Sequence, residues 1–146
     1  MPSPAPIMTT QTLTPAQLKL CATYRNLGLW TLQGWLAMFF VAAGYAKLTE
    51  PMDNLIALMS WPAMASDGFV RGLGAMEVGL ALALLTPLIS WRIGRPVLLA
   101  AAAGLAMLEI VMTGVHAIGG EWDLAAVNLI LLAMTGAVLW GRRPSA

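Results

Sequence analysis

Two carboxylates, Glu77 and Glu109, stand inside long apolar stretches of the sequence, where ionisable side chains are rare. With a helical rise of about 1.5 Å per residue, each lies about 12–13 Å below the outer end of its predicted span, so the two fall at the same depth. Facing carboxyls at that depth could share a proton, or one could hydrogen-bond to His116. Such a group can pass protons or hold a polar head group, such as a quinone carbonyl or an alcohol.

The same carboxylates also fit a purely structural role. Glu77 and Glu109 would then be neutral, or paired with Lys47 or Arg71, and would only fix the register of the helices. Intramembrane ionisable residues are functional more often than buried ionisable residues of soluble proteins are. The sequence therefore favours a functional role and leaves the structural one open.

Three further polar residues extend the candidate site. His116 is the only histidine, which excludes a bis-histidine haem within the chain, and we expect it to hydrogen-bond near Glu121. Asn128 is expected to donate a hydrogen bond between helices. Cys21 is the only cysteine, so an internal disulfide or a cysteine-ligated iron–sulfur cluster is excluded. We expect no metal and no cofactor within the chain, and a quinone or a lipid as the ligand.

Every candidate residue lies on a polar or small-residue stripe of an otherwise apolar helix. Turning these stripes inward makes a bundle with a polar pocket in its outer half. The predicted pocket consists of Lys47, Glu77, Glu109, His116, Glu121 and Asn128. The stripes themselves run through Gln33, Ala37, Phe40, Gly44 and Lys47; through Gly74, Glu77 and Ala81; through Ala102, Ala106, Glu109, Met112, Thr113 and His116; and through Glu121, Ala125, Asn128, Leu132 and Thr135.

The elements that must position this pocket follow from composition. Hydrophobic residues make up 59% of the chain and charged residues only 10%, against about 25% in a soluble domain. Too few charges remain to cover a soluble surface. Four apolar stretches approach the roughly 20 residues that span a bilayer. The sequence predicts an all-α membrane protein, a four-transmembrane-helix bundle over residues 27–141, with spans at about 27–48, 69–90, 94–118 and 124–140.

The remaining segments have distinct expected roles. Residues 1–14 read as a disordered cytoplasmic tail, 15–26 as an interfacial segment whose helix begins at Thr14-Pro15, and 142–146 as a second cytoplasmic tail. Between the first two spans, helical spacing of apolar residues predicts a short extracytoplasmic surface segment that ends at Trp61-Pro62. Five tryptophans fall at span ends and are expected to be interfacial anchors: Trp30, Trp61, Trp91, Trp122 and Trp140.

Charge distribution predicts the orientation. Six basic residues and no acid fall on the side that holds both termini, whereas the other side has two basic residues and five acids. Both termini should therefore be cytoplasmic. The net charge of +1 argues against a nucleic-acid partner. The expected partners are membrane lipid and other membrane protein subunits. The six basic residues are Lys19, Arg25, Arg92, Arg95, Arg142 and Arg143.

Four short motifs follow one another along the predicted spans. They are Gly44-Tyr45-Ala46-Lys47-Leu48; Gly74-Ala75-Met76-Glu77-Val78-Gly79-Leu80, with Thr86-Pro87 after it; His116 with Gly120-Glu121; and Asn128-Leu129. This pattern resembles the DoxX and DoxX-like family of bacterial four-helix membrane proteins, over about residues 35–142. Lys47, Glu77, His116, Glu121 and Asn128 fall on family motif positions, whereas Glu109 does not.

The resemblance implies a bacterial inner membrane and a connection with redox chemistry. The family takes its name from a subunit of a thiosulfate:quinone oxidoreductase, and its relatives are linked to membrane redox complexes. We therefore expect an accessory or structural subunit of a quinone-linked electron-transfer complex. The alternatives are a stand-alone membrane enzyme or proton-coupled carrier that uses the Glu77, Glu109 and His116 pocket, and a purely structural packing subunit. The absence of redox-cofactor motifs favours accessory and packing roles over an enzyme acting alone.

Overall fold

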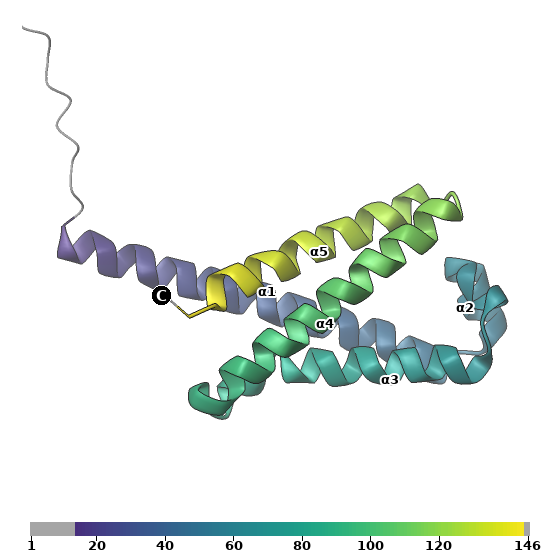
Figure 1. Ribbon diagram of the computed structural model, residues 1–146, viewed down its shortest axis with the longest axis horizontal. Helices are drawn as coiled ribbons and strands as arrows, with labels where there is room; N and C mark the ends of the chain where they lie inside the picture. Colours follow the sequence, from purple (N-terminus) through teal and green to yellow (C-terminus); the bar gives the residue numbers. More distant parts are fainter. Residues whose placement is uncertain (1–13, 145–146) are drawn as a thin grey trace, which may run out of the picture.

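The computed structural model describes residues 14–144 and, within them, an all-helical chain. Four helical stretches, Pro15–Thr49, Asp67–Leu88, Trp91–Ile118 and Trp122–Arg142, are long and apolar enough to cross a membrane, which confirms the predicted four-helix membrane bundle. The tail predicted over residues 1–14, apart from Thr14, and the last two residues of the chain lie outside the described residues. The elements are α1 (Pro15–Thr49), α2 (Met52–Met59), η1 (Trp61–Met64), α3 (Asp67–Ala83), η2 (Thr86–Leu88), α4 (Trp91–Ile118) and α5 (Trp122–Arg142) (Figure 1).

Helix α1 begins where the sequence predicts but is not divided. The Thr14 hydroxyl accepts a hydrogen bond from the Gln17 amide, and the Gln17 side chain accepts one from the Thr14 amide, which completes a capping box. Residues 15–26, predicted as a separate interfacial segment, continue directly into the first span. No glycine or proline interrupts the sequence between Pro15 and Gly28, so nothing breaks the helix there.

The four long helices form two closely packed pairs, α1 with α3 and α4 with α5 (Figure 1). Gly44 and Gly74 mark the closest approach of the first pair: a Cβ atom on Gly44 would lie 2.6 Å from the Gly74 carbonyl oxygen, and one on Gly74 would lie 2.7 Å from that of Gly44. The second pair is joined by a tight corner, in which Gly120 adopts a left-handed φ of 75°. Glycine is thus required at all three positions.

The second span is shorter as a regular helix than the predicted 69–90. Pro87 has no N–H, so α3 gives way to the short helix η2. Two side chains satisfy carbonyls released at this point: the Thr86 hydroxyl donates to the Ala83 carbonyl at 2.7 Å, and the Gln33 amide donates to the Leu84 carbonyl at 3.1 Å. The third span begins at Trp91, three residues earlier than predicted, directly after the extended residue Ser90.

An apolar core fills the middle of the bundle. Its buried residues come from all four long helices and include Leu36, Phe40, Leu98, Leu105 and Val138. Many large apolar side chains remain exposed on the outer helix faces, as expected where lipid covers the protein. We call the end at which α1 begins and α5 ends the basic end, and the end at which α1 ends and α5 begins the acidic end, after their charged residues.

Helix α2 and η1 cover the acidic end (Figure 1). The structure has the short predicted helix at Met52–Met59 and, after it, the Trp61-Pro62 step. Leu55 and Trp61 pack with Val70 of α3 into a small second apolar cluster. This cluster anchors the cover to the bundle.

Candidate functional site

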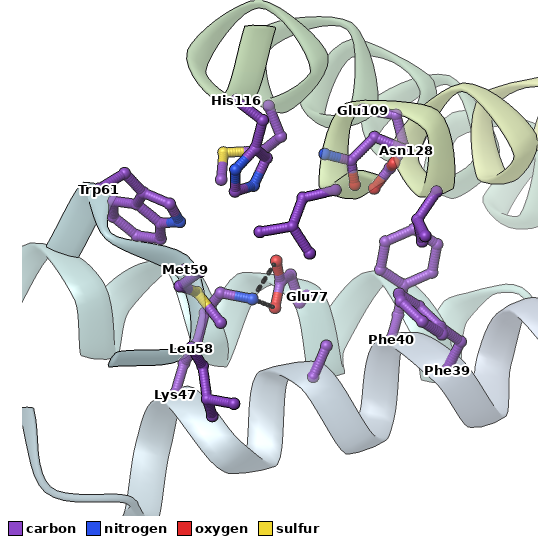
Figure 2. A pocket seen from close by; sticks show the side chains of 14 residues that line it. Phe39, Phe40, Lys47, Leu58, Met59, Trp61, Glu77, Glu109, His116 and Asn128 are labelled. Carbon is purple, nitrogen blue, oxygen red and sulfur yellow. Dashed lines mark hydrogen bonds and ion pairs between the residues drawn. The ribbon is translucent and has the colours of Figure 1, made fainter. Parts of the chain in front are cut away.

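A cavity of about 280 Å³ lies at the acidic end, between the two helix pairs and next to the α2–η1 cover (Figure 2). Five of the six predicted site residues line it: Lys47, Glu77, Glu109, His116 and Asn128. Glu121 is not part of the lining but contacts His116 from the α4–α5 corner. The structure therefore brings together side chains from all four long helices. The rest of the lining is largely apolar and comprises Phe39, Phe40, Ala43, Leu58, Met59, Trp61, Met112, Leu124 and Val127.

Glu77 forms a buried ion pair with Lys47. The Lys47 Nζ atom lies 3.0 and 2.8 Å from the two Glu77 carboxyl oxygens, and the residues are 5% and 3% exposed (Figure 2). Each residue follows a close-contact glycine by three positions, Lys47 after Gly44 and Glu77 after Gly74, so the helix contact holds the two side chains face to face. The hydrogen-bond partner of Glu77 is therefore Lys47, not Glu109, in agreement with the structural alternative for this residue.

Arg71, the other suggested partner of a carboxylate, has a different role. Its Nη1 atom donates to the carbonyls of Lys47 and Glu50, both at 2.7 Å, and its Nε atom lies 3.2 Å from Asp67. The first two contacts satisfy carbonyl groups at the end of α1, which a helix terminus leaves without partners. Arg71 thus stabilises the α1–α3 pair directly beside Lys47.

Glu109 has a buried carboxyl oxygen without a partner. The residue is 3% exposed, and its Oε2 atom makes no hydrogen bond with the described residues. The Nδ2 atom of Asn128 is also buried and has no hydrogen-bond partner within residues 14–144, so the predicted interhelical hydrogen bond from Asn128 was wrong. Figure 2 shows both side chains on the α4–α5 side of the cavity, opposite the Lys47–Glu77 pair. Buried polar atoms without partners are costly, which points to a missing bonding partner here.

Trp61 is a cavity residue that sequence reasoning missed. We predicted an interfacial anchor, but the residue is 7% exposed and lines the cavity from η1. Its indole Nε1 is a third buried polar atom at the cavity for which the described part of the chain offers no hydrogen-bond partner. The Trp61-Pro62 step was visible in the sequence as a helix end, but nothing in the spacing showed that the following turn folds inward.

His116 joins the end of α4 to the start of α5, as expected. Its Nδ1 atom lies 2.6 Å from the Glu121 Oε2 atom. Glu121 lies between the two spans, and hydrogen bonds from the Ser60 hydroxyl and from His116 hold the pKa of its carboxyl below the ordinary value. Through His116, Glu121 therefore links the end of α4 to the start of α5.

We expect the substitution Glu121→Gln to lower the Tm at neutral pH, with a difference that disappears under acid conditions. Because the carboxyl has a lower pKa in the folded than in the unfolded protein, its stabilising effect is complete above the ordinary value of 4.5 and is lost as the pH falls through the folded pKa. Thermal unfolding in detergent across this pH range provides the measurement. Asp123→Asn is the matched control, because it removes an acid from the same helix N-terminus without contacting His116. A difference that persists in acid would contradict the assignment.

The rim of the cavity is apolar. Phe39 of α1, Leu58 of α2 and Val127 of α5 line the cavity and are also exposed on the surface of the protein. Phe39 and Val127 lie on helices long and apolar enough to span a membrane, and in a bilayer their exposed side chains face lipid. A lipophilic molecule could therefore reach the polar groups from the side without crossing an aqueous phase.

The donor set is poor in metal ligands. Among residues 14–144, no three His, Cys, Asp or Glu side chains gather closely enough to hold a metal ion. The polar groups that face the cavity are one lysine–glutamate ion pair, one further carboxyl, one carboxamide, one indole N–H and one imidazole. Such a set is suited to hydrogen bonding and proton exchange with an organic ligand.

Comparison with known proteins gave one match. A family model described as the DoxX-like family matches residues 31–138, a range that includes all six predicted site residues. No curated protein and no solved structure matches the chain.

Proposed function

The chain belongs to the DoxX-like family, and from that premise we propose that it is an accessory subunit of a membrane electron-transfer assembly that binds the head group of a quinone. The observation that carries this proposal is the set of three unpartnered buried polar atoms around one cavity. These atoms are the Trp61 indole Nε1, the Asn128 Nδ2 and the Glu109 Oε2. A ligand that bonds to all three removes the cost of leaving them buried and unpaired.

The chemistry of a quinone suits these three groups. The Trp61 and Asn128 N–H groups are donors, and the carbonyl oxygens of a quinone are acceptors. Glu109 donates to a carbonyl when it is protonated and accepts from a quinol hydroxyl when it is ionised. One pocket can thus hold both redox forms of the ligand.

Size and access agree with a lipophilic head group. The cavity of about 280 Å³ is slightly smaller than the 300–1,000 Å³ typical of small-molecule sites, a size that suits a head group rather than a whole ligand. Phe39, Phe40 and Met112 offer apolar contacts to a ring, and the exposed apolar rim lets a hydrocarbon tail extend into lipid.

Transport of protons across the bundle is less well supported than binding. Below the cavity, Leu36, Leu105 and Val138 belong to a closely packed apolar core, and the polar side chains buried between the cavity and the basic end, Gln33 and Thr135, carry no ionisable group. The Lys47–Glu77 pair is also mutually satisfied and does not need an exchanging partner. A pocket closed on one side by such a core is suited to holding a ligand.

An accessory role fits the residue inventory better than an enzyme acting alone. With one histidine, the chain cannot hold a haem between two histidines, and with one cysteine it cannot hold a cysteine-ligated iron–sulfur cluster. Electrons would therefore pass between the bound quinone and a partner subunit. We place the protein, on this proposal, in the bacterial inner membrane with the basic end toward the cytoplasm.

We expect Asn128→Leu and Glu109→Leu each to weaken quinone binding by about tenfold, the value of one hydrogen bond in a buried site. Neither side chain forms a hydrogen bond with the described residues, so neither variant should lower the Tm. Binding is measured by quenching of tryptophan fluorescence with a short-chain benzoquinone, and Trp61→Phe identifies the signal from the cavity.

The matched control is Asp123→Asn, which removes an acid at the same end of the bundle but outside the cavity. It should bind the benzoquinone like the wild type. Saturable binding that is unchanged in both cavity variants would refute the proposed site. If the wild-type protein showed no saturable quenching, quinone binding would be refuted and the purely structural packing subunit would be the remaining alternative.

A further inference from the structure

A second polar cavity, of about 290 Å³, lies at the basic end, on the far side of the apolar core from the first. It is formed where α1, α4 and α5 meet. Four arginines and one asparagine line it, and no aspartate or glutamate does: Arg25, Asn26, Arg95, Arg142 and Arg143, together with Leu29, Trp91 and Gly141.

Arg142 is the centre of this cavity and is buried, with 5% of the residue exposed. We predicted that it would begin a cytoplasmic tail, but it is the last residue of α5. Its Nε donates to the Gln33 side chain at 2.7 Å and its Nη1 to the Asn26 side chain at 2.6 Å. Its guanidinium also lies 5.0 Å from the Trp30 ring centroid and 5.1 Å from that of Trp91. All four partners are uncharged.

These contacts orient the guanidinium but leave its charge unbalanced. The Nη2 atom of Arg142 is buried and has no hydrogen-bond partner among the described residues. A buried charge without a counter-ion is costly, and arginine is suited to binding phosphate through its planar set of N–H donors. An unpartnered donor on a buried arginine therefore indicates an anionic ligand.

Neighbouring groups add to this preference. Arg95 donates its Nε to the Arg142 carbonyl at 2.8 Å, so it is held beside the cavity. The Arg143 guanidinium stacks over the Trp140 ring, 3.5 Å from its centroid, and Arg25 lines the cavity from α1. Several positive charges on three helices thus converge without an acidic side chain among them.

We propose that this basic-end cavity binds the phosphate group of an anionic phospholipid. The cavity lies at a membrane-interface level, since Trp91 and Trp140 are at this end of the bundle and are exposed. Large apolar side chains are exposed on the same ends of the helices, Leu27 on α1 and Ile93 on α4, and can contact the acyl chains. Basic pockets between transmembrane helices bind anionic head groups in this way. The lipid links the ends of α1, α4 and α5 through one phosphate.

Native mass spectrometry of the full chain, released from detergent after equilibration with defined lipids, tests the proposal. We expect more retained phosphatidylglycerol than phosphatidylcholine, and an affinity for phosphatidylglycerol reduced by about fivefold in Arg25→Gln and in Arg95→Gln. Arg25 forms no hydrogen bond with the described residues, so its variant should fold normally. Arg92→Gln is the matched control, because it removes the same charge one turn away on α4 without lining the cavity.

The outcomes separate the proposal from its alternatives. Equal losses in Arg92→Gln and in the cavity variants would show diffuse attraction to surface charge and overturn the site. Equal retention of the two lipids would overturn the preference for an anionic head group. A third arm adds glycerol phosphate without lipid: a rise in Tm that requires Arg25 and Arg95, in the absence of lipid retention, would place a soluble phosphate in the cavity and overturn the lipid.

Discussion

Replacing Lys47 with methionine is expected to lower the free energy of unfolding by about 3–5 kcal/mol, the usual cost of removing one partner of a buried ion pair. Lys47 and Glu77 are almost completely buried, and the Lys47 ammonium group contacts both carboxyl oxygens of Glu77. Without the lysine, the buried Glu77 carboxyl would face the cavity with no counter-charge. Unfolding of the purified protein by SDS in mixed micelles measures the change.

A double variant separates loss of the pair from loss of packing. Lys47→Met with Glu77→Met removes both charges and keeps most of the volume, so it should recover most of the lost stability. Lys19→Met is the matched control, because Lys19 lies on the same helix, is exposed and has no acidic partner among the described residues. If Lys47→Met were as mild as Lys19→Met, the ion pair would not stabilise the bundle.

The second large effect is expected at the contact between α1 and α3. Gly44→Ala and Gly74→Ala should each cost about 3 kcal/mol, at the upper end of the usual range for overpacking. A Cβ atom on Gly44 would lie 2.6 Å from a backbone oxygen of α3, and one on Gly74 would lie 2.7 Å from a backbone oxygen of α1. Backbone cannot move aside by changing a rotamer, so the two helices must separate. The same SDS unfolding measures the loss.

Matched glycines lie on the same two helices. Nothing lies within 4 Å of a Cβ atom built on Gly34 of α1 or on Gly79 of α3. Gly34→Ala and Gly79→Ala should therefore be neutral or stabilise by up to about 1 kcal/mol, because alanine favours the helix. Equal effects at Gly34 and Gly44 would mean that the tight contact does not limit stability. Separation of the helices in Gly44→Ala should also weaken the Lys47–Glu77 pair, so the two effects should not be additive.

The fold was largely predictable because the sequence contains simple physical signals. Long apolar stretches predicted four spans, and the small or polar stripe along each one predicted its inward face, as buried Gln33, Phe40 and Glu109 confirm. Span boundaries were less predictable. Pro87 marks a break, but hydropathy alone does not show that the regular helix ends at Ala83 or that α1 extends unbroken from Pro15.

The candidate site was predictable in its location and less so in its bonds. The depth of Glu77 and Glu109 along their spans, and the helix faces on which they lie, correctly predicted that they share one cavity. Which group pairs with Glu77 depends on the contact between Gly44 and Gly74, and this contact between two helices is not visible in the sequence. Trp61 and Arg142 were missed for a related reason. Both stand at span ends, where an anchor at the surface and a buried side chain have the same sequence signature, and only the packing of neighbouring elements decides between them.

The division of the bundle into two pairs bears on its synthesis. α1 and α3 are consecutive spans, as are α4 and α5, so each pair can form as soon as its second member leaves the ribosome. Lys47 and Glu77 both belong to the first pair. The lysine and the glutamate can therefore neutralise each other while the second half of the chain is still being translated. Once the α1–α3 hairpin has formed, neither the Lys47 nor the Glu77 charge is exposed to lipid without its counter-charge.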